Sequence, residues 1–187
     1  MYTQRITEVL ERAPIIAATD SSGWQEALMS DVEVLFHLSA DIMTVQSELK
    51  AAKAHKKYVF VHIDLAEGIG KDKTGIHWLA RMGVDGIIST RAQLIRSAKE
   101  CGVTAIQRFF VLDSKGMHSI SEMIENSRPD FIEIMPGVIP KALSLFSEKG
   151  IPIIAGGLIE TKAEVTAALS SGAVAVSTGK SSLWSIL

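Results

Sequence analysis

The stretch IPIIAGGLIETKAEVTAALSSGAVAVSTG, residues 151–179, predicts one complete strand–helix–strand unit. Its two apolar runs have the length of buried strands, and each of them ends in a turn of small residues. Between them, Thr161 and Glu164 have the spacing of a capping box, and Gly172 is placed to end the helix that follows. Two neighbouring strands therefore end in small residues, which fits either two ordinary turns or one ligand held between the strand ends.

The same alternation runs through the whole chain. Apolar runs that are nearly continuous, as expected of strands buried on both faces, recur eight times. They begin at Pro14, Val32, Lys57, Asp85, Val103, Pro129, Ile151 and Ala173. Helical signals separate them, including a second capping-box spacing at Thr90 and Gln93 and a helix-opening proline, Pro140. Parallel strands joined by helices satisfy this pattern, because each crossover helix covers one face of the sheet.

Eight such units predict an α/β fold, a compact (β/α)8 TIM-like barrel in a single domain that spans residues 1–187. Only KSSLWSIL follows Gly179, so the last helix is expected to be shortened. An open doubly wound sheet is the alternative architecture. The chain contains no linker, low-complexity tract or block of charge that would indicate a second domain.

Composition narrows the classes of function. The 187 residues include 19 basic and 21 acidic side chains, a net charge of −2, so contact with nucleic acid requires a local basic patch. The single cysteine, Cys101, allows no intrachain disulfide and fits a reducing, cytoplasmic setting. No apolar stretch approaches about 18 residues, so we expect no membrane span. The histidines show no metal-ligand spacing, and we expect neither a metal nor a cofactor.

In a barrel of this kind, ligands bind at the carboxyl ends of the strands, and phosphate commonly binds at the loops after strands seven and eight. Small residues let the backbone approach an anion closely, and consecutive N–H groups make a concave anion site. The turns of the opening stretch stand at those two strand ends. We therefore expect phosphate to bind at Gly156, Gly157, Ser177, Thr178 and Gly179.

Two carboxylates at other strand ends indicate what else the ligand carries. Asp64 and Glu133 can accept hydrogen bonds from hydroxyl groups, which predicts a small phosphorylated polyol as the ligand. The alternative is that these carboxylates pair with Arg108 or cap loops. His62 beside Asp64 is either a catalytic partner or a hydrogen-bonded core histidine. No lysine lies within a strand near its carboxyl end, which argues against Schiff-base chemistry.

Basic residues gather near loops at the same end of the predicted barrel. They are Lys71, Lys73, Arg91, Arg108, Lys141 and Lys180, and all except Arg108 are candidates for contact with nucleic-acid phosphates. A second basic run, KAHKKY from Lys53 to Tyr58, falls at the end of a helix and hence at the opposite end of the barrel. It is expected to be a solvated helix end that complements the helix dipole.

Several segments together resemble the glycerol uptake operon antiterminators, the glycerol-3-phosphate-responsive regulators of bacteria. The matching segments are VHIDLAEGI (Val61–Ile69), DGIISTRAQLI (Asp85–Ile95), IQRFFVLDS (Ile106–Ser114), PDFIEIMPGVIPK (Pro129–Lys141) and IPIIAGGLI (Ile151–Ile159). The resemblance implies a (β/α)8-like fold that senses glycerol-3-phosphate as its effector. It also implies binding to the leader mRNA of glycerol-utilisation operons, which prevents a terminator hairpin from stopping transcription.

Carried over residue by residue, the resemblance places the ligand at Asp64, Glu133, Gly156, Gly157, Thr178 and Gly179, with Arg108 nearby. The chain departs from the family pattern where it has Thr19-Asp20 after the first strand and Glu160 after GGLI, positions that are often basic in relatives. A non-catalytic regulator is therefore the main hypothesis. The alternatives are a phosphate-binding TIM-barrel enzyme acting on a small polyol or sugar phosphate, and a ligand-binding protein that acts through a protein partner. Exposed helix faces leave a homodimer open.

Overall fold

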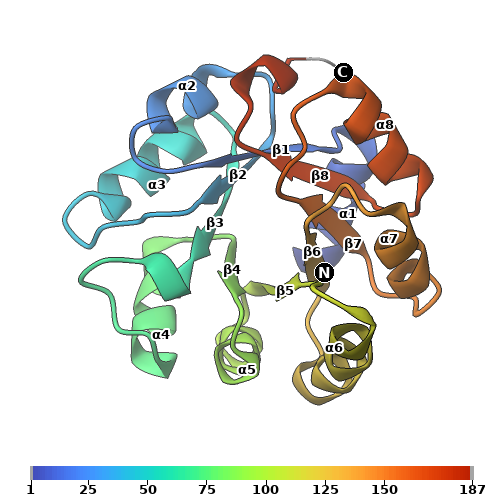
Figure 1. Ribbon diagram of the computed structural model, residues 1–187. Coiled ribbons are helices and arrows are strands. Elements are labelled where there is room, and N and C mark those ends of the chain that lie inside the picture. Colours follow the sequence, from blue (N-terminus) through green and yellow to red (C-terminus); the bar gives the residue numbers. More distant parts are fainter. Residues whose placement is uncertain (1, 186–187) are drawn as a thin grey trace.

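The chain folds into a closed barrel of parallel strands surrounded by helices (Figure 1). The computed structural model describes residues 2–185, without the side chains at 2, 3, 114, 115 and 118. Over these residues the strand order is β1 to β8 in sequence, and β1 pairs with β8 to close the ring. The predicted (β/α)8 barrel is confirmed, and the open sheet is excluded because it would leave β1 and β8 unpaired. Within the described residues, no helix is both long and apolar enough to cross a membrane.

The strands are short and the helices alternate with them regularly. The strands are β1 (Ile15–Thr19), β2 (Val34–His37), β3 (Tyr58–His62), β4 (Gly86–Ser89), β5 (Thr104–Phe110), β6 (Phe131–Met135), β7 (Ile153–Gly156) and β8 (Ala175–Thr178). The helices are α1 (Tyr2–Arg12), α2 (Trp24–Met29), α3 (Val45–Ala54), α4 (Lys73–Met82), α5 (Ala92–Glu100), α6 (Ser114–Ser127), α7 (Pro140–Ser147) and α8 (Lys162–Ser170), with 3-10 turns η1 (Ile63–Leu65) and η2 (Ser181–Leu183).

The last βα unit is shortened as predicted. Within residues 2–185, the 3-10 turn η2 is the one helical element after β8, and the indole Nε1 of Trp184 donates to the carbonyl of Thr178 at 2.9 Å. The capping box of α8 is confirmed, because the Thr161 hydroxyl accepts from the amide of Glu164 and the Glu164 carboxylate accepts from the amide of Thr161. This short ending holds the chain close to the end of β8.

The core has two parts, one inside the barrel and one between the strands and the helices. The inner part includes Ile6, Val9 and Leu10 of α1, a helix that was not predicted from the sequence. These residues belong to the same cluster as Phe36 and Phe60 from the strands. In the view of Figure 1, α1 (blue) lies behind the strands, at the end of the barrel from which the strands start. The helix thus closes the amino-terminal end and leaves the carboxyl-terminal end for a ligand.

Strand alternation sets a polar layer directly above the inner apolar layer. Successive residues of a strand face opposite sides, so residues two apart face the barrel interior together. Phe60, Ile106, Phe131 and Ala175 belong to the inner apolar cluster, and two positions further along the same strands stand His62, Arg108, Glu133 and Ser177. All four of these polar side chains are buried. The period-two pattern therefore gathers the charged groups at the carboxyl end of the barrel.

Candidate functional site

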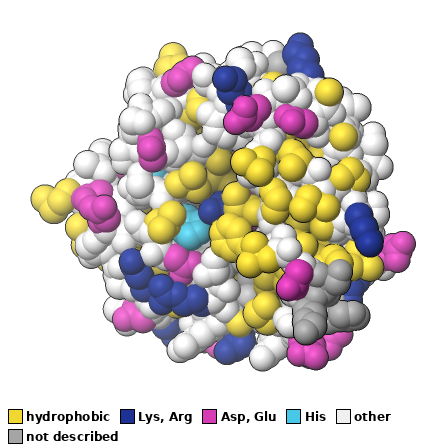
Figure 2. All heavy atoms as spheres, viewed as in Figure 1, with side chains coloured by type: hydrophobic (Ala, Val, Ile, Leu, Met, Phe, Trp, Pro, Cys, Tyr) yellow, Lys and Arg dark blue, Asp and Glu magenta, His cyan; other side chains and the backbone are white. Residues whose placement is uncertain are grey.

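A cavity of about 330 Å³ opens at the carboxyl-terminal end of the barrel, between the turns that follow β7 and β8. Figure 2 shows this face with a hollow near its centre, where basic and histidine side chains adjoin a broad apolar area. Both turns of the opening stretch contribute to the one cavity. The lining residues are Ala18, Leu38, Arg108, Glu133, Met135, Gly157, Leu158, Ile159, Glu160, Ser177, Thr178, Gly179 and Lys180.

Free backbone amides line part of this cavity. Gly157 and Leu158 both have positive φ, 74° and 60°, a conformation that is uncommon for leucine. Among the described residues, the amides of Gly157, Leu158 and Gly179 find no hydrogen-bond acceptor. Unpaired N–H groups that surround a cavity form an anion-binding concavity, because each carries a partial positive charge. Leu158 is a residue that the sequence prediction missed, since nothing local marks a leucine for the left-handed region.

Arg108 supplies a positive charge at the base of the cavity. Its Nε donates to Oε2 of Glu133 at 2.6 Å, and the other carboxylate oxygen of Glu133 accepts from the Ser177 hydroxyl at 2.6 Å. Glu133 is fully buried and Arg108 is 8% exposed. No bond of the terminal guanidinium nitrogens of Arg108 occurs within the described part of the chain. Glu133 therefore orients Arg108, and both of its oxygens are already occupied.

The other predicted phosphate residues take different positions around the cavity. Gly156 does not line it, and a Cβ at Gly156 would lie 2.5 Å from Oε1 of Glu133, so glycine makes room for the buried carboxylate. The buried Thr178 hydroxyl donates to the carbonyl of Ile159 at 2.7 Å and accepts from the amide of Lys180 at 3.0 Å. Thr178 thus ties the two turns together, while Gly157 and Gly179 form the lining itself.

His62 lies in the same polar layer, with only 4% of its surface exposed. Burial lowers its pKa first of all, and the positive charge of Arg108 lowers it further, against smaller opposing effects of Asp64 and Glu133. Its Nδ1 is buried without a hydrogen-bond partner in the described residues. The imidazole is therefore neutral at pH 7, and no hydrogen bond joins it to Asp64 as in a catalytic couple.

Asp64 stands apart from the cavity lining. Its carboxylate accepts from the Ser89 hydroxyl at 3.0 Å and from the amide of Thr90 at 2.7 Å, and it forms an ion pair with Arg91 at 3.2 Å. These contacts replace the predicted capping box of α5, which was wrong: the N-cap of α5 is Arg91, and the Thr90 hydroxyl donates to Asp64 instead of capping the helix. Asp64 thus links the end of β3 to the loop after β4, in agreement with the alternative prediction that it caps a loop.

The predicted RNA-contacting residues are dispersed around the barrel. Arg91 is engaged by Asp64, and the ammonium of Lys73 lies 2.5 Å from the carboxylate of Glu100 on α5. Lys180 lines the cavity between the β7 and β8 turns, whereas Lys141 lines a separate groove between α6 and α7. Lys71 is exposed in the loop before α4. The structure therefore does not gather these five residues into one patch.

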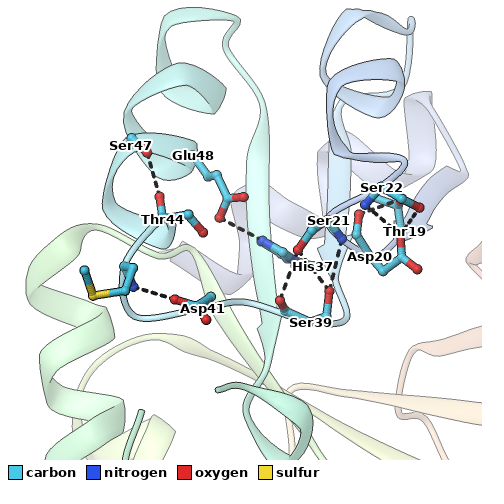
Figure 3. A network of polar contacts seen from close by, with 11 residues as sticks. Thr19, Asp20, Ser21, Ser22, His37, Ser39, Asp41, Thr44, Ser47 and Glu48 are labelled. Carbon is cyan, nitrogen blue, oxygen red and sulfur yellow. Dashed lines mark hydrogen bonds and ion pairs between the residues drawn. The ribbon is translucent and has the colours of Figure 1, made fainter. Parts of the chain in front are cut away.

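The loops after β1 and β2 show what Asp20 contacts in place of the basic residue that the family pattern often has there. Figure 3 shows that Asp20 turns its carboxylate back onto its own loop, where Oδ1 accepts from the amide and hydroxyl of Ser22 at 2.9 and 2.6 Å. These bonds lower the pKa of Asp20. Ser21 and Ser39 join the two loops, since their hydroxyls lie 3.2 Å apart. This side of the mouth is held by hydroxyl groups and a capping carboxylate rather than by cations.

Comparison with known proteins places the chain in a family. The family model described as glycerol-3-phosphate responsive antiterminator matches residues 15–184. A protein of Escherichia coli K12 described as uncharacterized protein YgcP is 36% identical over 184 residues, which are 97% of this chain and 96% of that protein. Among the residues that the structure describes, no group of three His, Cys, Asp or Glu side chains is arranged to hold a metal ion.

Solved structures agree with the family match. A glycerol uptake operon antiterminator regulatory protein from Listeria monocytogenes is 38% identical with a TM-score of 0.85, over 91% of this chain and 94% of that one. A glycerol uptake operon antiterminator-related protein from Thermotoga maritima is 35% identical with a TM-score of 0.82, over 92% and 98%. Aldolase structures of 12% to 15% identity share only the barrel fold. The chain belongs to the glycerol-3-phosphate responsive antiterminator family.

Proposed function

We propose that the cavity between the β7 and β8 turns binds glycerol-3-phosphate and that the liganded protein prevents transcription termination by binding leader mRNA. The observation that carries the ligand assignment is the meeting of unpaired amides and a buried guanidinium in one cavity. Gly157, Leu158 and Gly179, whose amides have no acceptor among the described residues, and Arg108 all belong to its lining. A phosphate dianion satisfies these donors and offsets the cationic charge of Lys180 at the rim.

The size of the cavity fits a small phosphorylated polyol. About 330 Å³ lies at the lower end of the range for small-molecule sites. The Ser177 hydroxyl donates to Glu133, which leaves its oxygen lone pairs available to a ligand hydroxyl. Glu133 acts through Arg108 in this proposal, because its oxygens have partners. Direct contact of Asp64 with the glycerol part stays a prediction that its position outside the lining does not support.

The regulatory part of the proposal follows from the family. The family description is that of an antiterminator responsive to glycerol-3-phosphate, so ligand binding must change the fate of a transcript. We infer that the protein acts in the cytoplasm on the nascent leader mRNA. Glycerol-3-phosphate would bind more tightly to molecules whose β7 and β8 turns are ordered. Its binding would therefore increase the fraction of molecules in that conformation, which we take to be the one that binds RNA.

Calorimetric titration tests the ligand assignment. Glycerol-3-phosphate is expected to bind with micromolar affinity or better, inorganic phosphate weakly, and glycerol not measurably, because most donors face the anion. In vitro transcription through a glycerol-operon leader then tests the output, with read-through of the terminator expected only when protein and glycerol-3-phosphate are both present. Equal binding of glycerol and glycerol-3-phosphate would contradict the anion site, and turnover of glycerol-3-phosphate by the purified protein would contradict the regulator assignment.

A further inference from the structure

A second cavity, of about 450 Å³, lies at the opposite end of the barrel and is lined mainly by cations. It is formed where α3 ends and β3 begins, next to α1. We name it the basic groove, and its lining residues are Arg5, Glu33, Lys53, Lys56, Lys57, Tyr58 and Asp85. Four of the seven side chains are cationic and two are acidic, although the whole chain has a net charge of −2. Positive charge is therefore concentrated locally on an otherwise acidic protein.

Lys57 is part of the framework of the basic groove. Its ammonium donates to the carbonyls of Ser30 and Val32 at 2.6 and 2.5 Å. Partial burial lowers its pKa, while Asp31 and Glu33 raise it by a smaller amount. The predicted description of this run as a solvated helix end is therefore wrong for Lys57, which holds the start of β3 against the loop before β2. Its position leaves the neighbouring lysines to face solvent.

Lys53 and Lys56 carry the available charge. No ion pair involves either of them in the described part of the chain. Lys53 lies over Gly83, the left-handed C-cap of α4, where an added Cβ would be 2.4 Å from its ammonium nitrogen. Lys56 is exposed and has a positive φ of 58°, which turns it out of the end of α3. Two unpaired ammonium groups thus stand at one edge of the groove.

The two acidic groups are already engaged. Arg12 forms an ion pair with Glu33 at 2.7 Å, and Asp85 accepts from the amide of Val59 at 2.8 Å through Oδ2. Arg12 offsets the charge of Glu33, whereas the amide of Val59 is neutral and leaves the charge of Asp85 in place, so one remaining carboxylate charge stands against four cations. The groove therefore presents a net cationic surface to an incoming ligand.

An aromatic platform adjoins these cations. The guanidinium carbon of Arg5, on α1, lies 5.4 Å from the centre of the Tyr58 ring, which is partly exposed. Cations that contact phosphates beside an aromatic or guanidinium plane on which a base can stack are the features of single-stranded nucleic acid binding. An acidic peptide would use the cations but not the stacking plane, so the geometry favours RNA.

We propose that the basic groove is the surface on which the leader mRNA binds, with Lys53 and Lys56 contacting phosphates and the Arg5–Tyr58 pair stacking on a base. This inference rests on the proposed antiterminator function and replaces the loops at the mouth as the RNA face. Lys73 and Arg91 form ion pairs with Glu100 and Asp64, whereas no ion pair of Lys53 or Lys56 occurs among the described residues. Since the anion cavity and the groove lie at opposite ends, one molecule can hold both ligands at once.

Fluorescence anisotropy with a labelled transcript of a glycerol-operon leader, in saturating glycerol-3-phosphate, tests this assignment. The double variant Lys53→Gln/Lys56→Gln is expected to bind the leader about tenfold more weakly. The slope of log K against log salt concentration is expected to be shallower by about 1.4, because two contacts to single-strand phosphates are lost. Lys149→Gln/Lys162→Gln is the matched control for loss of two exposed lysines. Tyr58→Leu keeps an apolar side chain and removes the ring, and it is expected to weaken binding without changing the salt slope.

The outcomes separate this inference from the function on which it rests. Calorimetry with glycerol-3-phosphate verifies that the variants are folded, because neither lysine lines the ligand cavity. If the wild-type protein binds the leader and the Lys53→Gln/Lys56→Gln variant binds equally well, the groove is not the RNA surface. The same conclusion follows if Lys71→Gln/Lys141→Gln alone weakens binding, or if an acidic peptide competes and RNA does not. If the wild-type protein binds no leader although it binds glycerol-3-phosphate, the RNA-binding function itself fails.

Discussion

Replacing Arg108 by methionine separates its observed role, neutralising Glu133, from its proposed role in binding an anion. Methionine fills much of the space of the arginine stem without its charge. The substitution leaves the fully buried carboxylate of Glu133 without its partner at 2.6 Å, with only the Ser177 hydroxyl still bound. Removing one member of a buried ion pair costs about 3–5 kcal/mol, because the remaining charge stays buried and uncompensated. We expect the free energy of unfolding to fall by about that amount.

The double variant Arg108→Met/Glu133→Gln distinguishes charge from packing. Glutamine retains a partner for Ser177 but carries no charge, so the uncompensated carboxylate disappears and stability is expected to return to within about 1 kcal/mol of wild type. Affinity for glycerol-3-phosphate is not expected to return. Loss of a hydrogen bond to a charged group costs about 1.5–3 kcal/mol, which weakens binding about 10- to 150-fold in both variants.

Urea denaturation followed by tryptophan fluorescence measures the stabilities, and calorimetric titration measures the affinities. The reasoning is refuted if the single and double variants are equally unstable, because Glu133 would then not depend on the charge of Arg108. It is also refuted if Arg108→Met binds glycerol-3-phosphate as tightly as wild type, since the guanidinium would then face no part of the ligand.

Three further predictions concern stability and are read from urea denaturation. Because the pKa of His62 lies below its ordinary 6.5, the unfolded chain takes up a proton before the native one as pH falls below about 6.5, so the free energy of unfolding declines there. His62→Gln is expected to decline less between about pH 7.5 and about pH 5.5, and an identical decline would assign the effect to another group. Thr161→Ala removes the cap of α8 and is expected to cost about 1 kcal/mol, whereas Thr166→Ala, in the exposed middle of the same helix, should cost less than half as much. Gly86→Ala places a Cβ 2.3 Å from the buried ring of Phe60 and 2.6 Å from the backbone carbonyl oxygen of Thr104, so both the ring and the strand must shift, and the expected cost is about 1–3 kcal/mol; a stability within about 0.5 kcal/mol of wild type would contradict this.

The architecture of this protein follows from patterns that are local in sequence. Eight apolar runs separated by helical signals predict parallel strands with crossover helices, and their number favours the closed barrel; the pairing of β1 with β8, which excludes the open sheet, is seen only in the folded chain. The turns after β7 and β8 were also placed correctly at one end of the ring, since all parallel strands of a barrel end on the same side. Helix α1 was not predicted, although Ile6, Val9 and Leu10 have the i, i+3, i+4 spacing of an amphipathic helix; what the sequence does not display is that this apolar face packs inside the barrel, against residues from all the strands.

The roles of individual polar residues depended on contacts that the sequence does not display. Glu133 was an equally good candidate for binding a hydroxyl group or for pairing with Arg108, and only the folded barrel brings Arg108, 25 residues away, and Ser177, 44 residues away, onto its two oxygens. Thr90 has the spacing of a helix cap, yet its hydroxyl donates a hydrogen bond to the carboxylate of Asp64, which follows the neighbouring strand. The alternation of side chains along each strand, together with residue type, determines which polar side chains lie at the carboxyl-terminal end of the barrel. Which of their atoms stay free for a ligand depends on hydrogen bonds between distant strands, and those form only when the ring closes.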